Sequence, residues 1–156
     1  FMEQTPQRDN IKYSILTNGL MFREFYNTVP HVINNLQELG VSIDGASKET
    51  YEKLRLGGRW EKILEGLECM TELKKKYNFR FSLHMVVQQE NWHEVESMLE
   101  LGRTYNVDRI YFNKIEDWNT GIDFESQTFT ELEEFKKSIR RVSTDPIVWN
   151  NVVTLT

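Results

Sequence analysis

The stretch GVSIDG, residues 40–45, is the part of the sequence that decides the fold. Within it, apolar Val41 and Ile43 alternate with polar Ser42 and Asp44, which is the period of a β-strand with one apolar and one polar face. The residues that follow, Gly45 to Glu49, supply a turn glycine, a serine suited to cap a helix and an acidic first turn. We therefore expect a strand, a tight turn and a capped helix, the arrangement in which α/β proteins usually bind ligands.

The rest of the chain continues this alternation of strand and helix. Strands are predicted at residues 11–17, 36–44, 79–87 and 109–114. Helices are predicted at residues 21–35, 47–77, 92–105 and 129–142, with a break in the second at 56–59. Pro30 would divide the first helix, and the pairs Asn91 with Glu94 and Thr128 with Glu131 have the spacing of a capping box. This order predicts parallel strands joined by right-handed crossovers.

The fold class that follows is α/β: a partial TIM-like (β/α) barrel fragment with four parallel strands alternating with helices. Four strands are fewer than a closed barrel of this kind contains. We expect a polar lead-in at residues 1–10, a half-barrel at 11–145, and a C-terminal extension with a short β-prone stretch at 146–156.

Composition limits the classes of function. A chain of 156 residues with 39% hydrophobic and 28% charged residues is large enough for one domain with a core and is not typical of disorder. The net charge of −5 argues against a general affinity for nucleic acid or anionic membranes, and no apolar run approaches the roughly 20 residues of a membrane span. We find no secretory signal and expect a cytoplasmic location. Because the sequence starts at Phe1 without a methionine, we expect a fragment or a processed chain.

The alternation in the strands predicts which polar side chains face the interior. If the apolar alternate positions face the helices, the polar ones face inward, near the carboxyl ends of the strands. The inward set is then Ser42, Asp44, Ser82, His84, Val86, Tyr111 and Asn113, with Asn18 just past the first strand. Convergence of such groups is what a polar small-molecule site requires.

Simpler explanations exist for each of these residues. Asp44 and Asn18 each precede a glycine, as in ordinary turns, and a single inward histidine is often only hydrogen-bonded in a core. The only cysteine, Cys69, lies on a helical apolar pattern that favours a packed structural thiol, and alone it holds neither zinc nor an iron–sulfur cluster. We find no phosphate-binding glycine loop, nucleophile elbow or metal-ligand motif. The residues alone thus predict an α/β half-barrel with a polar interior.

Several short motifs occur together and in order. They are TNG at 17–19, VSIDGASKETYEKLR at 41–55, GGRW at 57–60, MVVQ at 85–88 followed by Asn91, VDRI at 107–110 and DW at 117–118. Over about residues 11–118 the chain thereby resembles the middle of radical S-adenosylmethionine (radical SAM) enzymes.

This resemblance implies a fold, two cofactors and a set of site residues. Members of the family hold a [4Fe–4S] cluster and S-adenosylmethionine in a six-stranded partial (β/α) barrel, and reductive cleavage gives a 5'-deoxyadenosyl radical that abstracts hydrogen from a substrate. The chain would supply the third to sixth strands. Ser42 matches a serine that contacts S-adenosylmethionine, and Arg55 matches a basic residue that pairs with its methionine carboxylate. His84 falls beside the adenosyl group, and Asn18 and Asp44 line the same cavity.

The chain departs from the family pattern at the cluster. The family's C-x3-C-x2-C motif, its first two strands and the glycine-rich end of the second are absent. We therefore expect the C-terminal part of a radical SAM domain that binds neither cofactor tightly by itself and is inactive alone. The full-length protein is expected to be a radical SAM enzyme of oxidoreductase or transferase type, acting on an unidentified small-molecule, peptide or glycan substrate, with no nucleic-acid or membrane partner.

Two other classes of protein remain open. One is a cluster-free barrel that works as a binding or interaction module, which the absence of C-x3-C-x2-C upstream in the gene would favour. The other is an unrelated barrel aldolase or hydrolase using Asp44 and His84 for proton transfer, which turnover without iron would favour. Removal of two strands would also expose the edge of the strand at 11–17, so we expect a homodimer through that edge or its coverage by residues 1–10.

Overall fold

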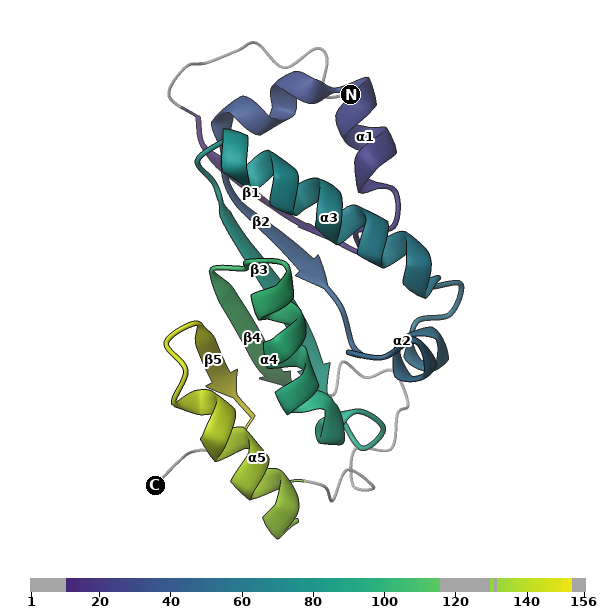
Figure 1. Ribbon diagram of the computed structural model, residues 1–156, viewed down its shortest axis with the longest axis vertical. Helices are drawn as coiled ribbons and strands as arrows, with labels where there is room; N and C mark the ends of the chain where they lie inside the picture. Colours follow the sequence, from purple (N-terminus) through teal and green to yellow (C-terminus); the bar gives the residue numbers. More distant parts are fainter. Residues whose placement is uncertain (1–10, 116–129, 131, 153–156) are drawn as a thin grey trace.

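In the structure, a computed structural model of the protein, the described residues are 11–115, 130 and 132–152. Five parallel strands form one sheet in the order of the sequence (Figure 1). They are β1 (Tyr13–Thr17), β2 (Leu36–Ser42), β3 (Arg80–Val87), β4 (Arg109–Lys114) and β5 (Val148–Asn151). The helices between them are α1 (Phe22–Thr28), η1 (Pro30–Asn35), α2 (Lys48–Leu54), α3 (Trp60–Lys76), η2 (Trp92–Glu94), α4 (Val95–Thr104) and α5 (Glu133–Ser143).

The predicted α/β fold class is confirmed, with one strand more than the four expected. The additional strand, β5, comes from the β-prone stretch that we assigned to a C-terminal extension. It pairs in parallel with β4, so that Trp149 lies opposite Tyr111 and Asn151 opposite Asn113. Helix α5 returns the chain to the amino end of the sheet, and the apolar Val148 then packs against the core. The sheet is therefore continuous through β5.

The helices cover one face of the sheet, where α3 and α4 lie over the strands in Figure 1. The side chains of the strands that point to this face are completely buried: Leu39, Val41, Phe81, Leu83, Met85, Val87, Ile110 and Phe112. Burial of each such side chain contributes about 1.5–3 kcal/mol to folding. The predicted alternation is confirmed, because the intervening residues of these strands point to the opposite, inner face.

The predicted helices are present, but their first and last residues differ from the prediction. Pro30 divides the first helical segment into α1 and η1, and the second is broken between α2 and α3. Ser47 caps α2 by accepting a hydrogen bond from the backbone N–H of Thr50. Helix α5 begins after Leu132 without a side-chain cap, while the proposed capping pair Thr128 and Glu131 lies outside the described residues.

The helices determine two further points: the environment of Cys69, and whether a membrane span is present. Cys69 is buried on α3, and burial raises the pKa of its thiol, as expected of a structural cysteine. Among the described residues, no helix is both long enough and apolar enough to cross a membrane.

Candidate ligand-binding face of the sheet

The inner face of the sheet carries a row of polar and aromatic side chains close to the carboxyl ends of the strands. The registers of β2, β3, β4 and β5 align Ser42, His84, Tyr111 and Trp149 side by side. Trp149 is 57% exposed, so no described segment covers this end of the row. In Figure 1, α2 lies beyond the arrowhead of β2, at the same end of the sheet. The polar side chains of Ser42, His84 and Tyr111, all predicted to face inward, therefore lie side by side on neighbouring strands.

Asp44 and Arg55 form the most ordered part of this region. Nε of Arg55 donates to Oδ2 of Asp44 at 2.8 Å, and Nη2 lies 2.7 Å from the same oxygen as an ion pair. The other carboxylate oxygen, Oδ1, accepts from the backbone N–H of Val86 at 2.9 Å. Because a guanidinium carries five N–H donors, at least three of those of Arg55 have no acceptor among the described residues. Asp44 therefore fixes the orientation of an arginine that can still bind an anion.

Asn91 ties the carboxyl ends of β2 and β3 together. Its Nδ2 donates to the carbonyl oxygens of Asp44 and Val86, both at 2.9 Å, and its Oδ1 accepts from the N–H of Gln88 at 2.8 Å. Asn91 is completely buried. These three hydrogen bonds of the Asn91 amide therefore all go to backbone groups, one at Asp44 and two at the end of β3.

Glu94 forms a second link, which we call the Glu94 clamp: Glu94 with Ala46, Ser47 and Thr50. The carboxylate accepts hydrogen bonds from the N–H of Ala46 at 2.6 Å, from Oγ of Ser47 at 2.5 Å and from Oγ1 of Thr50 at 2.7 Å. The residue is only 7% exposed. Burial alone would raise the pKa of Glu94, but the hydrogen bonds from Ser47, Thr50 and Ala46 outweigh it and lower this pKa.

The predicted capping box at Asn91 and Glu94 is therefore wrong. Asn91 occupies the position before η2, but its side chain makes no cap hydrogen bond. Both side chains instead reach the β2–α2 loop or the first turn of α2, between 44 and 48 residues away in the sequence. The three-residue spacing of Asn91 and Glu94 is the same in a capping box and in the observed arrangement, so local sequence could not distinguish the two arrangements. These two residues are the parts of the site that sequence analysis assigned to a different role.

His84 lies one strand further along the row. Its Nε2 is 3.1 Å from Oγ of Ser82, and its ring stacks on Tyr111 with 4.5 Å between ring centroids. Burial lowers the pKa of His84, and the negative charge of Glu38 partly opposes this effect. The histidine is accordingly neutral at neutral pH.

Ser42 and Asn18 differ in how far they are engaged. Ser42 is partly exposed, and its hydroxyl makes no hydrogen bond within the described part of the chain. Asn18 is exposed, and its Oδ1 accepts from the N–H of Leu20 at 3.2 Å, as in an ordinary turn. Asn18 follows Thr17, which lies opposite Val41, so it sits beside the Ser42 end of β2.

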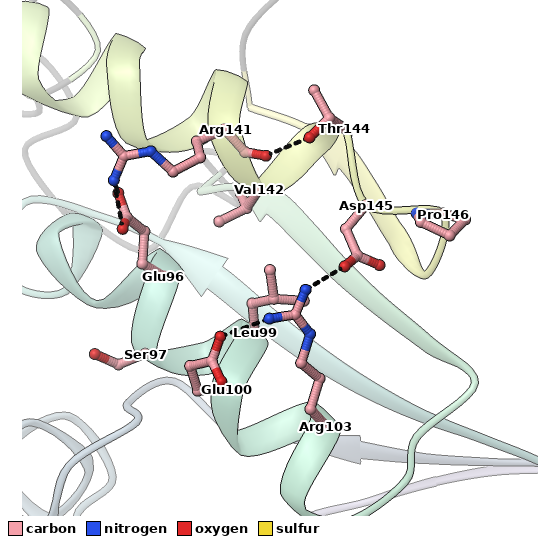
Figure 2. Close-up of a pocket in the computed structure, with 10 residues that line it drawn as sticks. All are labelled: Glu96, Ser97, Leu99, Glu100, Arg103, Arg141, Val142, Thr144, Asp145 and Pro146. Atoms are coloured by element: carbon pink, nitrogen blue, oxygen red, sulfur yellow. Dashed lines mark hydrogen bonds and ion pairs between the residues drawn. The ribbon is translucent and has the colours of Figure 1, made fainter.

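A surface hollow lies elsewhere, between α4 and α5 (Figure 2). Its charged side chains pair with one another: Arg141 with Glu96, and Arg103 with Glu100 and Asp145. We call this hollow the α4–α5 groove. It belongs to the helix layer, whereas the polar row lies on the inner face of the sheet. The groove thus shares no residue with the candidate site.

Comparison with known proteins identifies the family. The model of the radical SAM superfamily matches residues 2–102. The chain belongs to this superfamily. An AdoMet-dependent heme synthase of Methanosarcina barkeri is 29% identical over 99 residues, which are 60% of this chain and 26% of that protein. A "Probable GTP 3',8-cyclase" of Saccharolobus islandicus is 25% identical over 148 residues, 90% of this chain and 46% of that protein. The chain thus spans less than half the length of these curated relatives.

Solved structures support the same fold. The Streptococcus suis protein SuiB, in a crystal structure with S-adenosylmethionine, superimposes with a TM-score of 0.60 at 12% identity, over 94% of this chain and 32% of SuiB. TYW1, in a structure with a lysine–pyruvate adduct, gives a TM-score of 0.58 at 17% identity, over 88% of this chain and 42% of TYW1. At these identities the likeness concerns the fold alone.

The residues present do not fit an iron–sulfur cluster. A [4Fe–4S] cluster is held by cysteine thiolates, and the sequence contains only Cys69, which is buried on α3 in the helix layer. Within the described ranges, no three residues among His, Cys, Asp and Glu are grouped so that they could hold a metal ion. S-adenosylmethionine fits better, because within the described part of the chain Arg55 has donors left for a carboxylate and the hydroxyl of Ser42 on the inner face has no partner.

Proposed function

We propose that this chain is the C-terminal part of a radical SAM barrel and supplies one side of the S-adenosylmethionine site of a longer enzyme. The observation that carries the proposal is the Asp44–Arg55 pair at the carboxyl end of β2. There a partly buried guanidinium is held in place and has further N–H donors without a partner among the described residues. Family membership and the short coverage of the relatives support it.

Each residue has a specific role in this proposal. Arg55 binds the methionine carboxylate, because its planar fork can pair with both carboxylate oxygens. Asp44 is a positioning residue, since its two oxygens are already occupied by Arg55 and Val86. Ser42 hydrogen-bonds the ligand, and His84 and Asn18 line the same cavity.

The iron–sulfur cluster is assigned to residues outside this sequence. In the longer enzyme, S-adenosylmethionine would supply a 5'-deoxyadenosyl radical for hydrogen abstraction when it is cleaved reductively at that cluster. The contribution of this chain would be to bind and orient the ligand on the inner face of the sheet. By itself the chain would therefore be inactive, and the substrate class would depend on the complete protein.

Binding of S-adenosylmethionine to the anaerobically reconstituted full-length protein tests the proposal. Arg55→Gln should raise the dissociation constant tenfold or more, the effect of losing about 1.4 kcal/mol of binding free energy. The matched control is Arg140→Gln, which removes an exposed arginine on α5 and should leave the constant within about twofold. Equal affinities of the wild-type and Arg55→Gln proteins, with both folded, would refute the assignment of Arg55.

The free edge of β1 leads to a proposal about association. Within the described part of the chain β1 pairs only with β2, and Ile11 and Leu16 near it are 49% and 62% exposed. An uncovered edge of this kind tends to pair with another strand. We propose that the 156-residue chain alone forms a homodimer through β1. Sedimentation equilibrium should show the dimer, and a Leu16→Lys variant should weaken it; a monomer at every concentration would contradict the proposal.

A further inference from the structure

A second polar network lies on the inner face, next to the Asp44–Arg55 pair and separate from it. Oγ of Ser82 donates to Oε1 of Glu38 at 2.9 Å and lies 3.1 Å from Nε2 of His84. Ser82 is completely buried, and Glu38 is further fixed by an ion pair with Arg80 at 3.2 Å. Three side chains from β2 and β3 thus form a line from carboxylate to hydroxyl to imidazole.

The direction of these hydrogen bonds determines the tautomer of His84. A serine hydroxyl has one proton, and an ionised carboxylate can only accept, so the proton of Ser82 is directed to Glu38. Oγ of Ser82 must then accept from His84, which requires the proton of the neutral imidazole to be on Nε2. The lone pair is left on Nδ1, for which no described residue provides a partner.

The ring of His84 is packed between neighbours on two strands. It stacks on Tyr111 with an angle of 24° between the rings, and it lies close to Gly40. A Cβ atom at position 40 would stand 2.8 Å from Nε2, so a side chain there would displace the ring. Besides Glu38 and Arg80, Arg109 faces this stack, with its Cζ 6.0 Å from the centroid of the Tyr111 ring.

We propose that His84 is the proton acceptor of the inner face, with Ser82 and Glu38 as its positioning residues. Nδ1 accepts a hydrogen bond, and in a reaction the proton, from an N–H or O–H group of a bound ligand. The bond from that hydrogen to the ligand breaks, the ligand keeps the electron pair, and a new N–H bond forms on Nδ1. Nε2 keeps its proton, and Glu38 stabilises the imidazolium through Ser82.

Burial and charge around the ring agree with such a role. Burial lowers the pKa of His84, which keeps the imidazole neutral and able to accept a proton at neutral pH. Glu38 acts in the opposite direction and favours the charged form once a proton has arrived. This inference rests on the proposed function only in assuming that a ligand occupies the inner face; the state of the histidine can be measured without any ligand.

Nitrogen NMR of the imidazole rings in this chain tests the positioning. The Nε2–H tautomer of His84 should exceed the Nδ1–H tautomer about tenfold, because Oγ of Ser82 accepts from Nε2–H. Ser82→Ala should reduce this excess, and Glu38→Gln should lower the pKa of His84 further. Gly40→Ala, which displaces the ring while keeping the side chains of Ser82 and Glu38, should also reduce the excess. A wild-type protein with mainly Nδ1–H would overturn the proposal.

Acylation with diethyl pyrocarbonate, located by mass spectrometry, tests whether Nδ1 is an available base. His84 should be modified at neutral pH on Nδ1, in parallel with the exposed His31 and His93 as internal references. His84→Gln should remove that product and leave the other two. Failure of His84 to react while His31 and His93 do would overturn the proposal. Neither outcome depends on S-adenosylmethionine binding. Failure of this inference can therefore be distinguished from failure of the proposed function.

Discussion

The Glu94 clamp and the α4–α5 groove both join parts of the chain that are more than 40 residues apart, and both do so through carboxylates. They differ in burial. Glu94 is 7% exposed and receives three hydrogen bonds, two from the β2–α2 loop and one from Thr50 in the first turn of α2. In the groove, the side chains of Arg141 and Glu96 are 71% and 40% exposed (Figure 2).

This difference in burial explains why the region of the Glu94 clamp, and not the α4–α5 groove, is suited to support a ligand site. A buried carboxylate with three donors leaves those donors unsatisfied when it is removed, whereas an exposed ion pair is replaced by water at little cost. The clamp and Asn91 hold the β2–α2 loop on which Asp44 and Arg55 depend. The groove only associates α5 with α4.

The largest effect is expected from removing the clamp. Glu94→Ala should lower the free energy of unfolding by about 3 kcal/mol, because the N–H of Ala46 and two hydroxyls lose a charged acceptor in a buried position. Urea unfolding of the chain measures this loss. Glu96→Ala, two residues away and exposed, is the matched control and should cost less than about 0.5 kcal/mol. Similar losses in the two variants would show that burial does not separate the two regions.

A smaller loss is expected at Asn91. Asn91→Asp keeps the shape of the side chain but removes the two donors to the carbonyl oxygens of Asp44 and Val86. The free energy of unfolding should fall by about 2 kcal/mol, since buried acceptors are left without partners. In the full-length protein the same variant should also weaken binding of S-adenosylmethionine, because Asp44 orients Arg55. Unchanged stability would mean that the link between β2 and β3 is not needed.

Acid should affect the clamp in a defined direction. The pKa of Glu94 is lowered in the folded protein, so the stability it contributes is present above the unfolded value of about 4.3 and is lost as the pH falls through the lower folded value. The difference in unfolding free energy between the wild type and Glu94→Gln should therefore shrink below pH of about 4. Urea unfolding over a pH series measures it, and a constant difference would contradict the assigned hydrogen bonds.

The smallest effect is expected in the groove. Arg141→Gln should change the free energy of unfolding by less than about 0.5 kcal/mol. Even this difference should disappear in about 1 M salt, where charges at the surface are screened within roughly 3 Å. The effect of Glu94→Ala should persist in the same salt. A loss of unfolding free energy in Arg141→Gln that does not depend on salt would indicate that the groove contributes substantially to stability.

The fold could be predicted from the sequence because each strand has one buried face, and this face imposes an alternation of apolar and polar residues. Val41 and Ile43 are buried, and Ser42 lies on the inner face, as the period of two requires. The last strand was underestimated, because a four-residue strand at the sheet edge has a weak pattern. Its place in the sheet depends on α5 and on pairing with β4.

The site was only partly accessible from sequence. Asp44 and Arg55 were named as cavity residues, but their pairing across a loop depends on how α2 ends. Asn91 and Glu94 were assigned to a local cap because short spacing is all that a sequence shows, while their partners lie across the sheet. Ser82 was predicted only to face inward and Glu38 was not singled out, since their link to His84 exists only through the register of β2 and β3.

The most direct test of the account is hydrogen exchange of the full-length protein with and without S-adenosylmethionine. If the inner face at the carboxyl ends of the strands is the ligand site, exchange should slow over residues 41–60 and 80–94, which contain the clamp, Arg55 and His84. Exchange over residues 133–146, which contain α5 and one wall of the α4–α5 groove, should not change. Protection confined to residues 133–146, or none over 41–60 in protein that binds the ligand, would contradict the account.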